Sequence, residues 1–344
     1  MSKNRIKKSY KVAIIGLGYV GLPLAFEFGK KLPTIGYDIS SKRIKKLKER
    51  YDETNFLNNK KFKDAKNLFF SNRLKDIKNC NYKILALPTP VNKNKKPDLK
   101  ILQNACRMVG TQIKKDDLIV IESTVYPGAT NKICVSLLEK YSKLKNKIDF
   151  YVAYSPERIN PGDTKNNLKS IVKIVSSDNK IGLKKVKNIY RKINLNIFVA
   201  KDIITAESAK IIENVQRDVN IALVNEFAQL FTKLNIETNK VLEAAGTKWN
   251  FLKFKPGLVG GHCIGVDPYY LKYKSDLANY NSRLITIGRD INENFSKFIS
   301  KIVYKHLNAK NSKNVSVFGM TYKENIPDYR NSKIFDLVKY LKNK

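Results

Sequence analysis

Residues 11–21 read Lys-Val-Ala-Ile-Ile-Gly-Leu-Gly-Tyr-Val-Gly, and this stretch decides the fold of the first part of the chain. Its apolar run Val12–Ile15 predicts a buried strand, and the helical spacing over 19–31 predicts the helix that follows. Between them lie three glycines with the spacing G-x-G-x-x-G, Gly16, Gly18 and Gly21. The first such glycine makes a tight turn, the second lets the backbone approach a pyrophosphate, and the third permits close helix packing. The stretch therefore predicts a dinucleotide-binding turn.

An acidic residue predicts which dinucleotide binds. Asp38 ends the predicted strand 34–38, about 20 residues after the glycines, where a carboxylate pairs with the ribose hydroxyls of NAD. The same charge would repel the 2′-phosphate of NADP, so NAD is the expected cofactor. Arg43 lies nearby and could accept such a phosphate, which leaves NADP as the alternative. A glycine-rich turn that binds no nucleotide is a third interpretation, which the strand, the spacing and the acid together disfavour.

Alternating strand and helix patterns continue to about residue 200. The further predicted strands are 82–87, 118–121, 150–153, 171–175 and 197–199. Such alternation predicts an α/β fold with a doubly wound, Rossmann-like parallel sheet, here over residues 1–200. Pro88-Thr89-Pro90 and Ser123-Thr124 follow two of these strands, at the edge where such sheets bind ligands, although either could be a plain turn.

The rest of the chain has a different pattern. Residues 203–234 contain no glycine or proline and keep apolar residues at helical spacing, which predicts one long helix of about 45 Å. A second helix is expected over 282–307, packed against the first, and together they indicate a central dimerisation domain over 201–308. Val315–Phe318 then predicts a buried strand and 332–341 a helix. We expect residues 309–344 to be the start of a second Rossmann-like domain that is incomplete in this chain.

Composition excludes several classes of protein. The formal charge of +36 among 344 residues suggests nucleic acid, but the lysines are spread over nearly every segment and arginine is scarce, so no nucleic-acid partner is expected. No apolar run approaches the ~20 residues of a membrane helix, and no signal peptide is seen, which favours the cytoplasm. With two histidines and four cysteines that lack C-x-x-C spacing, no metal site is expected.

The segment 257–268, Gly-Leu-Val-Gly-Gly-His-Cys-Ile-Gly-Val-Asp-Pro, carries the densest chemical signal. Its glycines let the backbone approach a ligand, and Asp267 follows Cys263 by four residues, so a helical conformation would place both side chains on one face. A cysteine near a helix N-terminus is a better nucleophile, whereas the other cysteines are expected to be buried hydrophobes. His262 could activate the thiol or simply pack the loop, and we favour packing.

The long helix offers partners for this thiol. Lys210, Asn214 and Arg217 are spaced i, i+4 and i+7 and form one polar stripe. Such groups could stabilise an oxyanion and hold a phosphate. A solvated helix face would show the same spacing.

At this point the chain resembles the UDP-glucose/GDP-mannose dehydrogenase family over nearly its whole length. The resemblance rests on motifs in the family's order, at 16–21, 154–162, 207–225, 246–268 and 321–330. The sequences at 248–251 and 216–220 most resemble those of the UDP-N-acetylglucosamine and UDP-N-acetylgalactosamine 6-dehydrogenases of capsule, Vi-antigen and O-antigen synthesis. UDP-glucose enzymes carry an arginine upstream of the thiol loop, and here only Lys248 is nearby, which argues against UDP-glucose.

The resemblance implies a four-electron oxidation of a sugar C6 alcohol to a carboxylate with two NAD. It assigns Cys263 as nucleophile, Lys210, Asn214 and Asp267 as its partners, and Glu157 as acid/base for hydrolysis. It also implies cofactor contacts through Tyr19, Val20, Asp38, Arg43, Thr89, Thr124 and Arg330. Implied substrate contacts, besides Lys210 and Asn214, are Arg158, Ile159, Arg217, Gly260, Tyr322 and Lys323. Asn160-Pro161 stands where UDP-glucose enzymes often have a second glutamate, so that accessory role is not carried over.

Two alternatives remain at this point. The substrate could be UDP-N-acetylmannosamine or UDP-glucose rather than UDP-GlcNAc or UDP-GalNAc. Family members continue through a complete C-terminal domain that grips the nucleotide, so this chain could instead be an inactive dimerising NAD-binding module. We expect a UDP-sugar partner, a homodimer formed through the long helix, and no membrane partner.

Overall fold

The computed structural model describes residues 11–54, 56–158, 170–193, 196–312, 314–321 and 328–343. The chain divides into two compact units. One unit comprises residues 1–90 with 98–210, and the other comprises residues 91–97 with 211–344. Three residues proposed as substrate contacts, Ile159, Tyr322 and Lys323, lie outside the described residues, as does Asn160-Pro161.

The first unit is built on a six-stranded, fully parallel sheet in the order β3-β2-β1-β4-β5-β6. Its strands are β1 (Val12–Ile15), β2 (Thr34–Tyr37), β3 (Leu68–Ser71), β4 (Tyr82–Leu85), β5 (Leu118–Ile121) and β6 (Tyr151–Tyr154). This is the strand order of a Rossmann sheet, with its switch point between β1 and β4. β1, β4, β5 and β6 are buried at every position, as expected for strands covered on both faces. The predicted α/β class and doubly wound sheet are thus confirmed.

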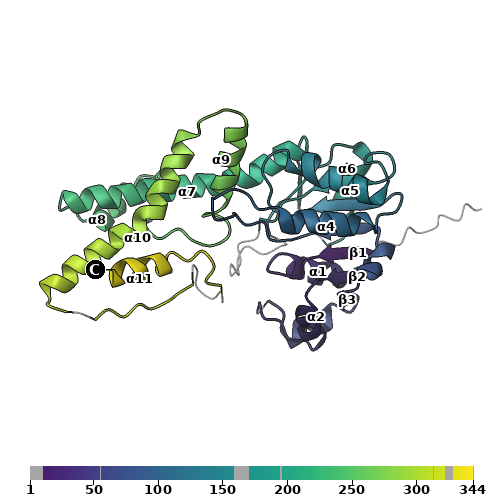
Figure 1. The fold of residues 1–344 in the computed structure, drawn as a ribbon, viewed down its shortest axis with the longest axis horizontal. Helices are drawn as coiled ribbons and strands as arrows, with labels where there is room; N and C mark the ends of the chain where they lie inside the picture. The colour runs from purple at the N-terminus through teal and green to yellow at the C-terminus, as the bar shows by residue number, and fades with distance from the viewer. Residues whose placement is uncertain are drawn as a thin grey trace, which may run out of the picture. The chain divides into compact units, whose positions relative to one another are not determined.

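Helices follow the strands and complete the layers (Figure 1). They are α1 (Gly21–Gly29), α2 (Ser41–Lys48), α3 (Asn59–Asp64), η1 (Leu74–Asn79), α4 (Lys100–Gly110), η2 (Thr130–Val135), α5 (Ser136–Ser142) and α6 (Lys180–Arg191). Their starts are capped in ordinary ways: the Ser40 hydroxyl accepts from the Arg43 N–H, and Asn179 accepts from two N–H groups of α6. The core includes Val12, Leu22, Phe28, Val120 and Tyr190, each fully buried or nearly so.

A small parallel pair, β7 (Lys173–Val175) and β8 (Ile197–Val199), continues this unit. Tyr154, the last residue of β6, exchanges backbone hydrogen bonds with Ser176, at 3.0 and 2.9 Å. This bridge sets the end of β7 beside the segment that leaves β6. Residues Ser155–Glu157 and Lys173 are therefore brought together, although they are far apart in sequence.

The second unit is helical in its described part. Its elements are the greater part of α7 (Ile203–Lys233), then α8 (Thr238–Ala245), α9 (Asp267–Leu277), α10 (Arg283–Ala309) and α11 (Ile334–Lys342). The predicted contact between the two long helices is confirmed by a buried ion pair, Asp218 with Arg289 at 2.6 Å, and by Asn225, whose amide donates to Asn292 at 2.8 Å. α10 and α11 also pack side by side (Figure 1).

Two sequence-based expectations need correction. The strand predicted at Val315–Phe318 is wrong: residues 314–320 have no regular structure, and the Phe318 side chain is 92% exposed. A strand needs a neighbour to pair with, and no described residue of the chain supplies one there. β3 was not predicted, because its run Leu-Phe-Phe-Ser is short and lies next to lysine-rich sequence. Among the described residues, no helix is both long and apolar enough to cross a membrane.

Candidate active site

The glycine turn between β1 and α1 has the geometry that its sequence predicts. Gly16 has φ +94°, and a Cβ there would lie 2.6 Å from the Ala86 carbonyl oxygen. A Cβ on Gly21 would lie 1.8 Å from the Gly16 carbonyl oxygen, so both positions require glycine. A Cβ on Gly18 would meet no atom within 4 Å, and Tyr19 and Val20 beside it are half-buried. The turn is thus tight on its inner side and open where a pyrophosphate would approach, which fits NAD.

The acid at the end of β2 is fixed in place. One oxygen of Asp38 accepts the backbone N–H of Leu17 at 2.9 Å, and the other accepts the N–H of Ser40 at 2.9 Å. Asp38 therefore stands beside the glycine turn, at the edge predicted for ribose recognition. Arg43 is turned toward the same turn: its guanidinium donates to the Leu17 carbonyl at 3.0 and 3.1 Å and pairs with Asp52 at 2.8 Å.

Two threonines proposed as cofactor contacts meet at the carboxyl edge of the sheet. The Thr89 hydroxyl donates to the Thr124 carbonyl at 2.7 Å, which joins the segment after β4 to the segment after β5. The backbone N–H of Leu87 donates to the Ser123 hydroxyl at 2.9 Å and ties the same two segments. Both segments lie next to the switch point, where ligands bind in open sheets of this kind.

The thiol lies in a turn that leads into α9. Cys263 is exposed, whereas the other three cysteines are buried, as predicted. Its carbonyl accepts the N–H of Asp267 at 2.9 Å, the i to i+4 contact of a helical turn. The Asn214 amide, from α7, donates to the Asp267 carboxylate at 2.6 Å, and both residues are buried. The structure therefore brings Asn214 and Asp267 together, next to the turn that carries the thiol.

The remaining polar residues of the long helix differ in burial. Lys210 is buried at 7% exposure, and it belongs to the first unit, whereas Asn214 and Arg217 belong to the second. Arg217 is exposed, and Gly260 of the thiol segment is half-buried. Arg217 and Gly260, two of the proposed substrate contacts, are thus accessible to solvent, whereas Lys210 and Asn214, proposed for the same role, are buried.

The thiol segment is held by side chains from two other parts of the second unit, α7 and residues 328–331. At its start, Asn225 of α7 accepts the Gly257 N–H at 2.8 Å and donates to the Gly257 carbonyl at 3.1 Å. In its middle, Asn331 donates to the Gly261 carbonyl at 3.2 Å. Because glycines allow many backbone conformations, these hydrogen bonds determine which conformation the segment adopts.

His262 is anchored by Asp328. Its Nε2 lies 2.7 Å from an Asp328 oxygen, and Arg330 pairs with the same carboxylate at 2.7 Å. Burial by itself would raise the pKa of Asp328, but hydrogen bonds from Arg330 and His262 outweigh it and hold that pKa well below its usual value. This arrangement agrees with a packing role for His262. It also places Arg330, a proposed cofactor contact, beside the thiol segment.

Glu157 lies in a buried cluster of charges in the first unit. Lys173 of β7 stands 3.0 Å from an oxygen of Glu157 and 3.0 Å from an oxygen of Glu122, which follows β5. The Tyr190 hydroxyl of α6 donates to the same oxygen of Glu122. All four side chains are at most 8% exposed. Arg158, a proposed substrate contact, donates its backbone N–H to Glu157 at 2.7 Å and its guanidinium to the Val172 carbonyl at 2.8 Å.

Burial and charge act in opposite directions on this cluster. Burial, reinforced by the charge of Glu157, raises the pKa of Glu122 to about 7 despite the neighbouring lysine. Burial lowers the pKa of Lys173, but the two carboxylates outweigh it and leave that pKa above its usual value. Lys173 is therefore charged at neutral pH, and Glu122 changes its charge near neutrality.

The sequence analysis missed Lys173, Glu122 and Tyr190. Signals existed for two of them. Lys173 is a charged residue inside the predicted strand 171–175, and a charged residue in a buried strand is expected only with a partner. Glu122, immediately after the strand 118–121, was equally visible. Nothing in the sequence showed that these residues meet.

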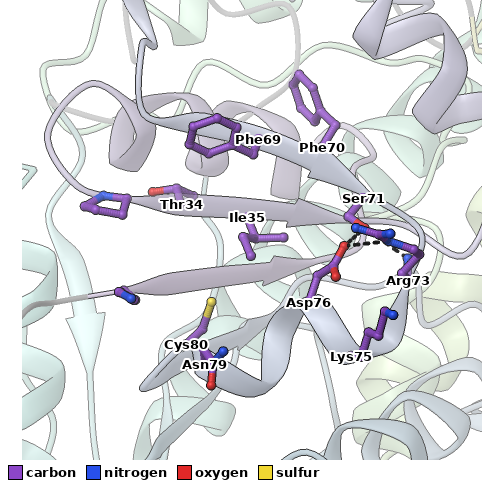
Figure 2. A pocket seen from close by; sticks show the side chains of 12 residues that line it. Thr34, Ile35, Phe69, Phe70, Ser71, Arg73, Lys75, Asp76, Asn79 and Cys80 are labelled. Carbon is purple, nitrogen blue, oxygen red and sulfur yellow. Dashed lines mark hydrogen bonds and ion pairs between the residues drawn. The ribbon is translucent and has the colours of Figure 1, made fainter.

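The first unit also contains a pocket that is separate from the proposed site residues (Figure 2). It runs along β2 and β3 past Ile35 and Phe69, and at one end Asp76 contacts Ser71 at 2.6 Å and Arg73 at 3.1 Å. Its lining includes none of the described residues proposed for catalysis or binding. Across the described ranges, no three His, Cys, Asp or Glu side chains group closely enough to hold a metal ion.

A Rossmann sheet with this glycine turn and acid, followed by a helical unit with an exposed thiol, defines an NAD-dependent dehydrogenase. Comparison with known families agrees. Residues 10–194 match the NAD-binding domain of the UDP-glucose/GDP-mannose dehydrogenase family, and residues 204–294 match its central domain. The chain belongs to this family of nucleotide-sugar dehydrogenases.

Individual relatives cover almost the whole chain. Protein CapL of Staphylococcus aureus is 49% identical over 336 residues, which are 96% of this chain and 79% of that protein. UDP-N-acetyl-D-glucosamine 6-dehydrogenase of Salmonella typhi is 48% identical, with 96% of this chain and 79% of that protein covered. The solved structure of UDP-D-ManNAc dehydrogenase from Pyrococcus horikoshii superposes with a TM-score of 0.89 at 34% identity, covering 97% of this chain and 81% of that one.

Proposed function

We propose that this dehydrogenase oxidises the C6 alcohol of UDP-N-acetylglucosamine, or of UDP-N-acetylgalactosamine, to the uronic acid for surface polysaccharide synthesis. The observation that carries the proposal is the exposed Cys263 in a fixed glycine turn, one helical turn from the buried Asn214–Asp267 pair. A thiol placed in this way can hold an aldehyde covalently between two oxidations. Bound NAD supplies the hydride acceptor for each oxidation.

In the first oxidation the chain has to remove a proton from the sugar alcohol. We assign this to Lys210 or Asp267, directly or through water. The Cys263 thiolate then adds to the aldehyde carbon and forms a C–S bond. Lys210 and Asn214 stabilise the resulting oxyanion, as donors to a charge that develops during addition.

In the second oxidation the thiohemiacetal becomes a thioester of Cys263. Water then adds to the thioester carbon, a C–O bond forms, the C–S bond breaks, and the free thiol returns. Glu157 accepts a proton from this water and is the proposed acid/base. Covalent capture explains why no free aldehyde has to leave the enzyme.

The cofactor and substrate contacts follow the motif positions. Cofactor contacts are assigned to Gly16, Gly18, Tyr19, Val20, Gly21, Asp38, Arg43, Thr89, Thr124 and Arg330. Substrate contacts are assigned to Arg158, Ile159, Lys210, Asn214, Arg217, Gly260, Tyr322 and Lys323. We retain the division into an NAD-binding domain over 1–200, a central domain over 201–308 and a nucleotide-binding segment over 309–344.

UDP-N-acetylglucosamine or UDP-N-acetylgalactosamine is favoured over UDP-N-acetylmannosamine by similarity. The relative named as a UDP-N-acetyl-D-glucosamine 6-dehydrogenase shares 48% of aligned residues, whereas a UDP-N-acetyl-D-mannosamine dehydrogenase shares 34%. The thiol segment also lacks the upstream arginine expected of UDP-glucose enzymes, with exposed Lys248 nearby.

We further propose that the enzyme is a homodimer formed through the long helix. Several large apolar side chains on α7 and at the start of α10 are exposed, namely Ile212, Leu223, Leu230, Leu284 and Ile287. Exposed apolar side chains in such number are typical of a surface that is covered in an assembly. Sedimentation equilibrium of the protein and of Leu223→Glu tests this: a monomer for both would refute it.

The decisive test is the stoichiometry of the reaction. Purified protein with limiting UDP-N-acetylglucosamine and excess NAD should form two NADH and one carboxylate per sugar, measured by absorbance and mass spectrometry. UDP-glucose, which lacks the N-acetyl group, and UDP-N-acetylmannosamine, which carries it in the opposite configuration at C2, should react at least about tenfold more slowly when tested in parallel, since a site that binds the N-acetyl group in one position discriminates against both. The proposal would be overturned by one NADH per sugar, or by no NADH with both UDP-N-acetylglucosamine and UDP-N-acetylgalactosamine.

A further inference from the structure

The buried cluster around Glu157 contains two other charged side chains, those of Glu122 and Lys173. Two carboxylates, Glu122 and Glu157, share one ammonium group, that of Lys173, at 3.0 Å each. Three strands or their ends and one helix contribute the four groups, which are 0 to 8% exposed. Burying charges without compensation is costly, so such a cluster persists only where its geometry is good.

A second buried lysine in the same unit shows what a purely structural pair looks like. Lys83 of β4 contacts a single carboxylate, Asp117, at 2.6 Å, and also donates to the Cys80 carbonyl. Asp117 lies at the amino end of β5, whereas Glu122 lies at its carboxyl end, the edge where ligands bind. Burial lowers the pKa of Lys83, the opposite of the direction found for Lys173.

We propose that Lys173 is a positioning residue for Glu157, and that Glu122 controls it by sharing the same ammonium group. The proposal rests on the acid/base role assigned to Glu157 above. When Glu122 is neutral, the Lys173 ammonium serves Glu157 alone and fixes one of its oxygens. When Glu122 ionises, the ammonium is shared by two carboxylates, and Glu157 becomes a stronger proton acceptor.

The contacts of Glu122 support this second part. Lys173 from β7 and Tyr190 from α6 contact its Oε1, and Glu157 from the segment after β6 is the other charged group that faces it. Its Oε2 is buried, and within the described residues no hydrogen-bond partner is found for it. A neutral carboxyl tolerates such an oxygen far better than a carboxylate does. Glu122 is thus placed to hold a proton near neutral pH.

The consequence is a distinct pH dependence for one stage of the reaction. Hydrolysis of the Cys263 thioester should accelerate as pH rises through the ionisation of Glu122, whereas the two oxidations should not follow this titration. The proton that leaves the attacking water goes to Glu157, and the thiol leaves the carbon at the same stage. No group beyond those already assigned is needed.

The test measures the two stages separately. Rapid mixing of enzyme, NAD and UDP-N-acetylglucosamine should give a burst of two NADH per site, and acid-quenched protein examined by mass spectrometry should show the thioester on Cys263. In Lys173→Met the burst rate should be kept, while steady-state acid formation falls about tenfold or more and thioester accumulates. Lys173→Arg should restore most of the hydrolysis rate, because it restores the charge.

Two further variants test the effect of Glu122 on hydrolysis and the structural cost of removing a buried lysine. Glu122→Gln should remove the rise in hydrolysis between about pH 6 and 8 while leaving the burst unchanged. Lys83→Met is the matched control, since it removes a buried lysine from the same unit without touching Glu157. It should lose stability to a similar degree and hydrolyse the thioester at the wild-type rate. Lys173→Arg and Glu122→Gln carry the test if Lys173→Met does not fold.

The outcomes separate this inference from the function on which it depends. If wild type does not form two NADH per sugar, the proposed function fails, and if Glu157→Gln hydrolyses the thioester normally, the role of Glu157 fails. If Glu157→Gln accumulates thioester but Lys173→Met and Glu122→Gln behave as wild type, the positioning proposal is overturned. Equal slowing of burst and hydrolysis in Lys173→Met, or the same hydrolysis defect in Lys83→Met, would show a structural role only and would also overturn it.

Discussion

The thiol segment and the glutamate cluster solve opposite physical problems. Cys263 is exposed in a glycine-rich turn whose path is set by hydrogen bonds from Asn225 and Asn331. Glu157 is buried among charges and is held by Lys173 at 3.0 Å. A nucleophile, the role proposed for Cys263, needs access to a large substrate, while an acid/base, the role proposed for Glu157, needs a defined proton affinity. The difference shows that one group is controlled by backbone geometry and the other by electrostatics.

The strongest way to break this contrast is to remove the thiol. Cys263→Ser should lower uronic acid formation by at least about a thousandfold, because a serine hydroxyl is a much weaker nucleophile at neutral pH. NAD binding, measured by calorimetry, should stay unchanged, since the glycine turn belongs to the other unit. Undiminished acid formation would refute the covalent role.

Removing one anchor of the thiol segment should have the next largest effect. Asn225 is fully buried and contacts both Gly257 and Asn292. Asn225→Ala should lower the free energy of unfolding by about 2–4 kcal/mol, because buried partners lose their hydrogen bonds. Urea denaturation measures this.

Asn220→Ala is the control for that variant, since the Asn220 amide donates to the Gln216 carbonyl one turn earlier in the same helix and the residue is only half-buried. It should cost less than about 1 kcal/mol. Equal costs for the two variants would show that the anchor contacts contribute nothing specific.

The glutamate cluster should reveal itself in the pH dependence of stability. The pKa of Glu122 is about 7 in the folded chain, above its unfolded value, so the folded state binds an extra proton between about pH 4.5 and 7. Its contribution is full below the unfolded pKa and is lost as pH rises through the folded pKa. Relative to Glu122→Gln, wild type should therefore lose up to about 1.4 kcal/mol per pH unit across this window. If the free energy of unfolding depends on pH in the same way in both proteins, the raised pKa of Glu122 is contradicted.

The thiol segment should respond to pH with the opposite sign and a smaller amplitude. The pKa of Asp328 is lowered in the folded chain, so its contribution is present above the unfolded pKa and is lost as pH falls through the folded one. Asp328→Asn should cost about 1–2 kcal/mol at pH 7, with the difference shrinking below about pH 4. Guanidinium titrations at several pH values measure this, and a cost that grows on acidification would exclude the assigned contacts.

Much of the fold was predictable because its signals are local. The run Val12–Ile15, the three glycines and Asp38 each carry their meaning within a few residues, and the uninterrupted helical pattern from 203 onward did the same for α7. The strand at Val315–Phe318 was not predictable in this way, because a strand depends on its neighbour as much as on its own residues. The same limit explains β3, whose short run gained its place only beside β2.

The sequence by itself determined the chemistry that is available: a dinucleotide turn, one thiol among glycines, and the order of motifs that defines the family. Tertiary structure decided which groups meet. Asn214 reaches Asp267 across 53 positions, and Lys173 joins Glu122 to Glu157 only because β7 bridges back to β6. Proton affinities depend on such meetings and on burial, both of which arise when distant segments pack together and exclude water.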